Sequence, residues 1–318
     1  MERTSRRARE DASALFLPAL TVAREGVLPA SALSTQARAQ ATLAAEVEPR
    51  VVYAHLSAAF CGRHPDLALQ WLHDVGLLDH HLPELVATVA LRQEGGRRHK
   101  DVWEHTKVVV RQAVPRLEVR WAAVLHDIGK VPTRRFVGPG KVTFHGHAEV
   151  GAEMFRAGPL RRLPFPPAVA ERVEGLILLH LRPGQYDGTW SDGAVRRFAR
   201  EAGPHLRDLL DLSRADVTSQ RPGQRRRCLF RISELARRIR ELAAADAKEP
   251  PLPAGLGHAL MDAFALPPGP HIGALRRRLE ALCDAGELTR GLAIERCVEE
   301  VARRGLVDEM AGVGRTPR

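Results

Sequence analysis

The sequence contains two histidines that are each followed directly by an aspartate and preceded by apolar residues. They lie in AAVLHDIGKVPT (122–133) and in QWLHDVGLLDH (70–80). Imidazole nitrogen and carboxylate oxygen are common metal ligands. Together they suit Mn, Fe, Co, Ni or Zn, with Mg as a further option. A metal ion needs more than two ligands, so a true site requires additional histidines or carboxylates nearby in space.

The pair His126 and Asp127 has such company elsewhere in the chain. Four further residues of ligand type each lie in or beside an apolar helical pattern, where a polar side chain needs a metal, an ion pair or a hydrogen bond. These residues are His105, His147, His180 and Asp216. Each of them alone has an ordinary structural explanation, but the whole set predicts one metal centre. His145 is an alternative to His147, although the helix start HAEVGA favours His147.

The second pair, His73 and Asp74, lacks such company. No upstream histidine has a comparable helical context, and Val75 belongs to the apolar stripe of the surrounding helix. A helix that ends at Gly76 places the pair at its C-terminus. We therefore interpret it as a surface pair that binds no metal.

Helices must position the ligands, because the composition favours an all-α fold. The 318 residues are 44% apolar and 5% aromatic, with many Ala, Leu, Arg and Glu and few β-branched runs. Asp101 is the predicted N-cap of the first ligand-bearing helix. The ligand-bearing helices are predicted at 101–114, 118–130, 147–157, 167–181 and 204–219. Residues 131–147 form a loop, in which a short hairpin near 135–144 is the one strand signal.

The ligand series resembles that of the HD metal-dependent phosphohydrolase superfamily. The motifs HT, HDIGK and GHAEVGA and the closing aspartate carry the resemblance. It implies a helical bundle that converges on one or two divalent ions. By this resemblance the first ion is held by His105, His126, Asp127 and Asp216. His147 and His180 match the ligands of a second ion, and Asp127 would bridge the two.

The same resemblance implies hydrolysis of a phosphoester. The cofactor would be Mn, Ni, Fe, Co, Zn or Mg, which lowers the pKa of bound water and supplies a nucleophile near neutral pH. We assign catalysis to Asp127, which would bridge the two ions, and to Lys130 and Arg182. Nearby cations such as these two side chains neutralise charge that develops on phosphoryl oxygens. The alternative roles are a C-terminal helix cation for Lys130 and a solvated loop residue before Pro183 for Arg182.

A longer stretch, about 50–310, resembles the C-terminal half of bacterial class II CCA-adding tRNA nucleotidyltransferases and their poly(A) polymerase relatives. The motifs that carry this resemblance are GRRHKDVWEHT, RWAAVLHDIGKVPTR, VTFHGHAEVGAEMF and LPPGPHIGAL. The nucleotidyltransferase head of that family needs a Gly-Ser turn followed by paired aspartates on a strand. The sequence contains no Gly-Ser dipeptide and no Asp-x-Asp. We therefore expect no nucleotide addition by this chain alone.

Four segments follow from these patterns. They are an N-terminal part without a clear pattern (1–45), a helical neck-like part (46–98), an HD domain (99–220) and a basic helical C-terminal part (221–318). The fold class is therefore all-α, an HD-domain helical bundle with flanking helical segments.

The formal net charge of +10 is concentrated in a predicted helix at about 225–245. A buried apolar stripe would leave its arginines on a common face, which suits the phosphates of an RNA. The resemblance indicates tRNA, and a merely solvated face is the alternative. The proposed RNA-binding residues are Arg225, Arg226, Arg227, Arg231, Arg237 and Arg238. Aromatic residues do not interleave with them in this prediction, so base stacking is not expected.

Cysteine content and hydropathy restrict the location of the protein. The four cysteines are far apart and form no CxxC pair, so neither a zinc cage nor a disulfide framework is indicated. Apolar runs are too short to span a bilayer, and the N-terminus lacks the apolar stretch of a secretory signal. We expect a cytoplasmic protein with no membrane partner.

The expected function is metal-dependent hydrolysis of phosphomonoesters or 2′,3′-cyclic phosphates, on nucleotides or on RNA or tRNA ends. A first alternative is a tRNA-maturation protein that binds tRNA and works with a separate protein carrying the nucleotidyltransferase head. A second alternative is a non-catalytic RNA-binding module. Asp127→Ala separates the enzyme from this module, because only the enzyme has turnover to lose.

Overall fold

The structure is a computed structural model and describes residues 13–91, 101–138, 142–248 and 250–307. Contacts divide the chain into two compact units, and each is described by itself. Unit 1 comprises Met1–Gln185 and Pro204–Ile232, and unit 2 comprises Tyr186–Gly203 and Ser233–Arg318. All six candidate metal ligands belong to unit 1.

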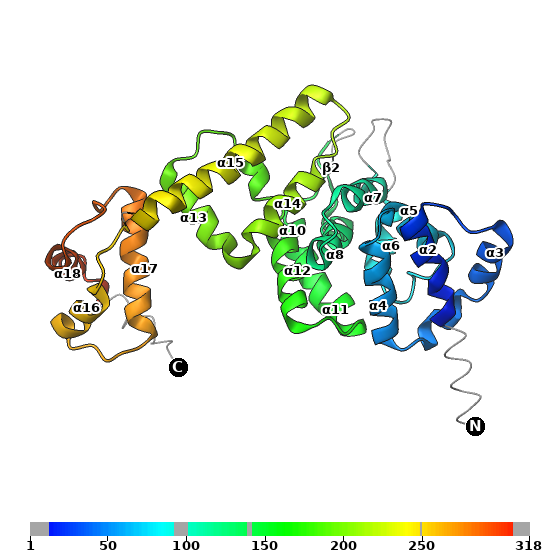
Figure 1. Cartoon of the computed structure of the whole chain (residues 1–318), viewed down its shortest axis with the longest axis horizontal. Coiled ribbons are helices and arrows are strands. Elements are labelled where there is room, and N and C mark those ends of the chain that lie inside the picture. Colours follow the sequence, from blue (N-terminus) through cyan, green and yellow to red (C-terminus); the bar gives the residue numbers. More distant parts are fainter. Residues whose placement is uncertain (1–12, 92–100, 139–141, 249, 308–318) are drawn as a thin grey trace. The chain divides into compact units, whose positions relative to one another are not determined.

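Helices make up nearly all of the regular structure in the described ranges (Figure 1). The strands found there are β1 (Arg135–Phe136) and β2 (Val142–Thr143), which pair antiparallel. The all-α fold and the short hairpin near 135–144 are therefore confirmed. None of the helices that the structure describes has an apolar stretch long enough to cross a membrane.

The first layer of unit 1 includes N-terminal residues for which the sequence pattern predicts no element. Its elements are η1 (Ala14–Phe16), α2 (Leu17–Glu25), α3 (Ser31–Ala39), η2 (Ala41–Glu46), α4 (Pro49–Phe60), α5 (Pro65–Asp74), α6 (Pro83–Val86) and η3 (Ala87–Ala90). Helix α2 packs against α4 and α5. It buries Ala19, Val22 and Ala23. Two of these three side chains are small, which explains why no wide apolar stripe marks this helix in the sequence.

The second layer of unit 1 is the bundle that carries the candidate ligands. Its helices are α7 (Val102–Gln112), α8 (Leu117–Leu125), α9 (Lys130–Thr133), α10 (His147–Ala157), α11 (Pro159–Arg162), α12 (Pro167–Leu179) and α14 (Leu206–Asp216), with the short η4 (Pro183–Gln185). The short η5 (Gly203–His205) precedes α14, and only its first residue is assigned to unit 2. Helix α8 contacts α4, α7, α12 and α14. Its residues from Val119 to Leu125 are all buried, so α8 is the central helix of this bundle.

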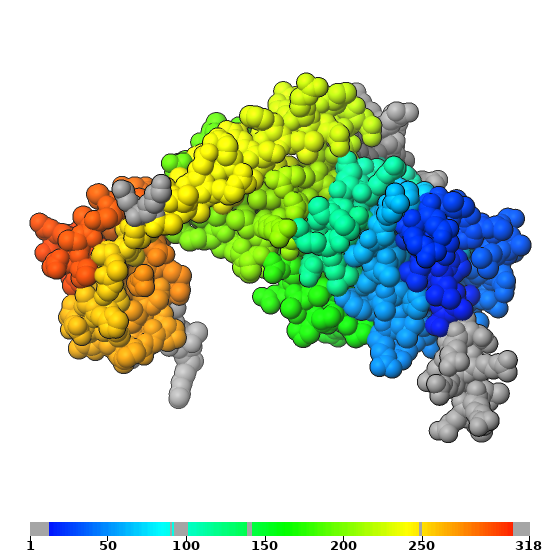
Figure 2. All heavy atoms as spheres, viewed as in Figure 1, coloured from blue at the N-terminus to red at the C-terminus, as the bar shows by residue number. Residues whose placement is uncertain are grey.

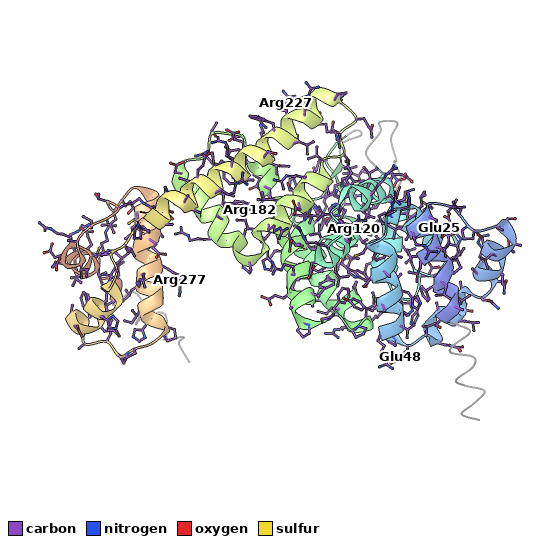
Figure 3. The ribbon with its side chains drawn as sticks, viewed as in Figure 1. Glu25, Glu48, Arg120, Arg182, Arg227 and Arg277 are labelled. Carbon is purple, nitrogen blue, oxygen red and sulfur yellow. The ribbon has the colours of Figure 1, made fainter. Side chains whose placement is uncertain are left out.

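Polar groups fix the position of α8 against its surroundings. Arg120 is only 5% exposed, and its guanidinium donates to the carbonyl oxygens of Phe60 (2.9 Å) and Val114 (3.1 Å) (Figure 3). The indole N–H of Trp121 donates to the hydroxyl of Ser57 at 2.9 Å. Buried polar groups of this kind stabilise a fold only when they are hydrogen-bonded. They therefore hold α8, and the His-Asp pair at its end, in one position relative to α4.

Unit 2 consists of α13 (Asp192–Ala202), α16 (Leu256–Phe264), α17 (Pro270–Ala285), α18 (Ile294–Arg303) and the later residues of α15 (Pro222–Lys248). Its core includes Leu260, Leu279 and Cys297, which are buried together. The helix predicted at about 225–245 is longer in the structure, because α15 runs from Pro222 to Lys248. All four cysteines are free thiols in the structure.

Candidate metal centre

Asp101 starts the first ligand-bearing helix as the sequence predicts. Its carboxylate accepts hydrogen bonds from the backbone N–H groups of Trp103 (2.9 Å) and Glu104 (3.4 Å), so it is the N-cap of α7. His105 lies one turn further along, with its side chain turned toward α14. The helix ends at Gln112 rather than at residue 114, ahead of Pro115.

The helix before the HDIGK motif ends earlier than predicted. Helix α8 stops at Leu125 instead of continuing to residue 130. The N–H groups of Ile128 and Lys130 bond to carbonyls three residues back, those of Leu125 (3.3 Å) and Asp127 (3.0 Å). Bonds of this spacing tighten the last turn of a helix. The His-Asp pair therefore lies in a tight turn at the end of a buried helix.

Gly129 explains the glycine of the HDIGK motif. A Cβ atom at this position would lie 2.1 Å from the carbonyl oxygen of His147 and 2.6 Å from the backbone nitrogen of Gly151. Only glycine permits this approach of the turn to α10. The two glycines thus bring His147, the first residue of α10, next to Asp127.

A first cluster forms around one oxygen of Asp127. The Nε2 atom of His105 lies 2.9 Å from Oδ1 of Asp216, 3.3 Å from Nε2 of His126 and 3.5 Å from Oδ2 of Asp127. Nε2 of His126 lies 3.3 Å from the same Oδ2 atom. Three candidate ligand atoms, on the HDIGK turn and at the end of α14, therefore lie within 3.5 Å of Nε2 of His105 on α7.

A second cluster forms around the other oxygen of Asp127. Oδ1 lies 3.5 Å from Nε2 of His147 and 4.0 Å from Nε2 of His180. The two imidazole Nε2 atoms are 3.2 Å apart. Asp127 is therefore placed between the two clusters, and the structure brings all six predicted ligands together.

Three of the histidine rings form hydrogen bonds through Nδ1, on the side opposite Nε2, and these bonds leave Nε2 free to bind a cation. Nδ1 of His126, His147 and His180 lies 2.7–2.9 Å from a backbone carbonyl oxygen, of Ala123, Phe144 and Ile177 respectively. A carbonyl only accepts, so each ring donates through Nδ1–H and its neutral form carries a lone pair on Nε2.

In their neutral forms, His147 and His180 therefore present Nε2 lone pairs to each other, and these two nitrogens are 3.2 Å apart. Ligand atoms around a tetrahedral Zn at 2.0–2.1 Å lie about 3.3 Å apart, so the observed spacing matches a shared cation. The residues present therefore fit a divalent ion.

Burial and charge set the protonation of the ligands. Burial lowers the pKa of His180 to about 4, and it also lowers the pKa of His147. Burial would raise the pKa of Asp127, but the charges of His126 and Lys130 hold that pKa well below its usual range. Near neutral pH the second cluster therefore has two neutral imidazoles and one carboxylate, which is the form that binds metal.

Lys130 and Arg182 lie close to the ligands in the chain. Nζ of Lys130 donates to Oδ2 of Asp127 at 2.6 Å, and it lies 5.7 Å from the centre of the Phe144 ring. Arg182 follows His180 by two residues, in the turn between α12 and η4, and is half-buried (Figure 3). Helix α12 ends at Leu179, two residues earlier than predicted.

The other candidate histidines lie outside both clusters. His145 is exposed, so His147 is the residue that faces Asp127. His73 is half-buried rather than on the surface, and its ring lies 4.9 Å from that of Trp103. Helix α5 ends there, with Gly76 in the left-handed conformation that closes many helices. Among the residues described, neither His73 nor Asp74 belongs to a metal-binding cluster.

The predicted RNA-binding arginines fall into two groups along α15. Four of them belong to unit 1 and have exposed side chains; these are Arg225, Arg226, Arg227 and Arg231, of which Arg227 is labelled in Figure 3. In unit 2, Arg237 pairs with Glu241, and Arg238 pairs with Asp192 at 2.7 Å and donates to the Tyr186 hydroxyl.

The expectation that no aromatic residue accompanies the arginines is wrong. Phe230 lies on α15 between Arg227 and Arg231 and is 66% exposed. The sequence shows this phenylalanine, but only the helix register shows that it faces solvent.

Sequence patterns do not indicate two polar residues that form hydrogen bonds at the candidate ligands. Nδ1 of His105 lies 2.9 Å from the Thr218 hydroxyl. The amide of Gln112 donates to the carbonyl oxygen of Ala215 at 2.7 Å, one residue before Asp216. Thr218 lies two residues after Asp216, so the sequence itself indicates a hydroxyl near that carboxylate. The contact of Gln112 with α14 depends on the fold and has no such signal.

The class of protein follows from this fold and this cluster. Residues 86–221 match the family model described as the HD domain, so this part of the chain is an HD domain. The predicted segment 99–220 lies within this match. HD domains bind divalent metal ions, and the cluster around Asp127 is compatible with that property.

The relatives identify the branch of this family. The A-adding tRNA nucleotidyltransferase of Deinococcus radiodurans is 37% identical over 236 residues, which are 71% of this chain and 52% of that protein. The CC-adding tRNA nucleotidyltransferase of Thermus thermophilus is 38% identical over 223 residues, which are 68% and 48% of the two chains. The multifunctional CCA protein of Tolumonas auensis is 30% identical over 112 residues, which are 34% and 27%.

The chain is therefore homologous to the HD-containing region of the A-adding, CC-adding and CCA-adding tRNA nucleotidyltransferases, as its motifs predict. It spans about half the length of the first two relatives.

Proposed function

We propose that this chain is a metal-dependent phosphohydrolase that acts on phosphomonoesters or 2′,3′-cyclic phosphates of nucleotides or of RNA ends. The observation that supports this most is the pair of facing Nε2 lone pairs on His147 and His180, beside a carboxylate that also faces His105 and His126. Such a donor set has no stable arrangement in the fold without a shared cation or extra protons.

The six candidate ligands would bind one or two ions. The first ion would be held by His105, His126, Asp127 and Asp216. A second ion would be held by Asp127, His147 and His180. Ions bound there would supply a Lewis acid that activates water for attack on phosphorus. We propose that the metal is Mn, Ni, Fe, Co, Zn or Mg.

The exposure of the ligands defines the side from which a substrate would approach. The side chains of Asp216 and Lys130 are 29% and 21% exposed, whereas His126, Asp127 and His180 are almost fully buried. The phosphoryl group would therefore enter on the side of Lys130, whose ammonium would neutralise charge that develops on its oxygens. We propose the same role for Arg182.

A panel of small substrates tests this function. Purified protein supplied with Mn, Ni or Mg is assayed on 2′,3′-cyclic AMP, on 2′-AMP and on an aryl phosphate, with Asp127→Asn as the matched variant. We expect metal-dependent turnover on at least one substrate, lost in the variant. Bound metal together with no turnover on any of the three would contradict the proposal.

A second candidate function rests on the relatives. Similarity to half of the A-adding and CC-adding tRNA nucleotidyltransferases favours a role in tRNA maturation, with tRNA as the partner and a separate nucleotidyltransferase protein supplying nucleotide addition. Copurification with such a protein would support this role. Incorporation of ATP or CTP into tRNA by the chain alone would contradict the division of labour.

A further inference from the structure

A pocket of about 530 Å³ lies between α7 and the first turns of α15, entirely within unit 1. Its lining includes Val108, Gln112, Thr218, Arg225, Arg226 and Leu229. The start of α15, in yellow-green, is open to solvent on the face that Figure 2 shows.

Two residues that line the pocket also form hydrogen bonds at the candidate metal centre. The hydroxyl of Thr218 lies 2.9 Å from Nδ1 of His105, whose opposite nitrogen faces Asp216. The amide of Gln112 donates to the carbonyl oxygen of Ala215. The pocket therefore adjoins the candidate ligands through the outer edge of His105.

The charge of the pocket suits an anion. Arg225 and Arg226 line it with exposed side chains, and none of the described residues of its lining is acidic. The amide oxygen of Gln112 accepts a hydrogen bond from the Arg225 guanidinium at 2.9 Å. A neutral amide oxygen thus holds the guanidinium of Arg225 at the pocket without neutralising its charge. Guanidinium groups bind phosphate oxygens with paired hydrogen bonds.

Phe230 adds a surface for a nucleobase. It follows Arg226 by four residues on α15, so the two side chains are neighbours on one face of the helix. The ring is 66% exposed, the largest exposure among the large apolar side chains of the described residues. Exposed aromatic rings beside arginines stack bases of single-stranded nucleic acids.

We infer that this pocket is a subsite for the penultimate nucleotide of an RNA strand whose terminal phosphate lies at the metal centre. Arg225 and Arg226 contact the internucleotide phosphate, and Phe230 stacks the base. The inference rests on the proposed function and refines it, because the preferred substrate becomes an RNA end rather than a mononucleotide.

The test compares 2′,3′-cyclic AMP with a trinucleotide that ends in a 2′,3′-cyclic phosphate. We expect the wild type to prefer the trinucleotide by about tenfold or more in kcat/KM, since hydrogen bonds to charged groups contribute on this scale. The double variant Arg225→Gln/Arg226→Gln should reduce that preference by about tenfold. The matched control Arg161→Gln/Arg207→Gln removes two exposed charges elsewhere in unit 1 and should keep it.

The stacking contact has its own control. Phe230→Leu should weaken the trinucleotide preference by about fivefold or more, and an abasic ribose at the second position should remove this effect. A wild type without the length preference, or a double variant that keeps it, overturns the subsite. An equal effect of Phe230→Leu on the abasic substrate overturns the stacking contact.

Failure of the subsite and failure of the hydrolase proposal are distinguishable. If neither substrate is hydrolysed, the hydrolase proposal fails, and the subsite is tested by fluorescence anisotropy with a 5′-labelled trinucleotide 2′-phosphate. Binding that weakens about tenfold in Arg225→Gln/Arg226→Gln, but not in the control, supports the subsite. Equal binding by both variants overturns it.

Discussion

The ammonium of Lys130 donates a 2.6 Å hydrogen bond to Oδ2 of Asp127, the carboxylate oxygen that also faces His105 and His126. The ammonium of Lys130 and a metal ion bound from solution would therefore contact the same carboxylate oxygen of Asp127. Lys130 is close enough to the candidate first metal site to repel an ion there, and also close enough to contact a phosphoryl oxygen bound to it.

Lys130→Met should separate these two effects. Removal of the charge should tighten divalent-metal binding by roughly three- to tenfold, because the repulsion is lost, and should lower phosphoester turnover at saturating metal. Calorimetric titration with Mn²⁺ and a turnover assay measure the two quantities. Lys107→Met is the matched control, since Lys107 pairs with Glu104 on α7 instead. Weaker metal binding by Lys130→Met would show that the ammonium does not oppose the ion.

Gly129→Ala should disturb both stability and metal binding. The added methyl group would collide with the backbone of His147 and Gly151, so the HDIGK turn and α10 must move apart. We expect a loss of roughly 2 kcal/mol or more in unfolding free energy, measured by urea denaturation, and weaker binding of Mn²⁺. Gly223→Ala, where the structure shows open space, should change neither quantity by a comparable amount. Similar behaviour of the two variants would refute the close approach.

The metal-free protein should lose stability as the pH falls from about 6.5 toward 4. The folded pKa of His180 is about 4, below the ordinary value of 6.5, so in this window the unfolded chain binds a proton that the native state does not. Stability from this group is fully present above pH 6.5, and on the order of 3 kcal/mol is lost by pH 4.

Denaturation of chelator-treated protein at several pH values measures this slope. In His180→Asn the side-chain amide can still donate to the Ile177 carbonyl but does not titrate, so its slope should be shallower. The raised pKa of His126 acts with the opposite sign, and the difference between the two proteins isolates His180. A slope that is identical in both proteins would mean that His180 is not a buried neutral imidazole.

The sequence predicts which imidazole and carboxylate side chains lie together, because this grouping depends on residue type and helical context. His105, His126, Asp127, His147, His180 and Asp216 all converge as the motifs indicate. What it does not predict depends on tertiary contact. The hydrogen bond between Gln112 and the end of α14 joins residues about a hundred positions apart, and the close approach of Gly129 to α10 likewise depends on how the chain folds back.

Sequence patterns predict neither the N-terminal helices nor the exposure of Phe230. Helix α2 packs through small alanines, so its buried face carries no strong apolar signal. Phe230 reads as a core residue by type, yet α15 turns it toward solvent. Type alone does not distinguish a core phenylalanine from an exposed one, and only the packing partners of the helix decide this.

We propose that the side chains around Asp127 hold at least one divalent ion. Equilibrium dialysis of the wild type and of Asp127→Asn against Mn²⁺ or Ni²⁺, followed by metal analysis, tests it directly, with circular dichroism to establish that the variant is folded. We predict about one or two equivalents in the wild type and a near-complete loss in the variant. A wild type that retains no ion, or a folded Asp127→Asn that retains as much, would contradict the claim.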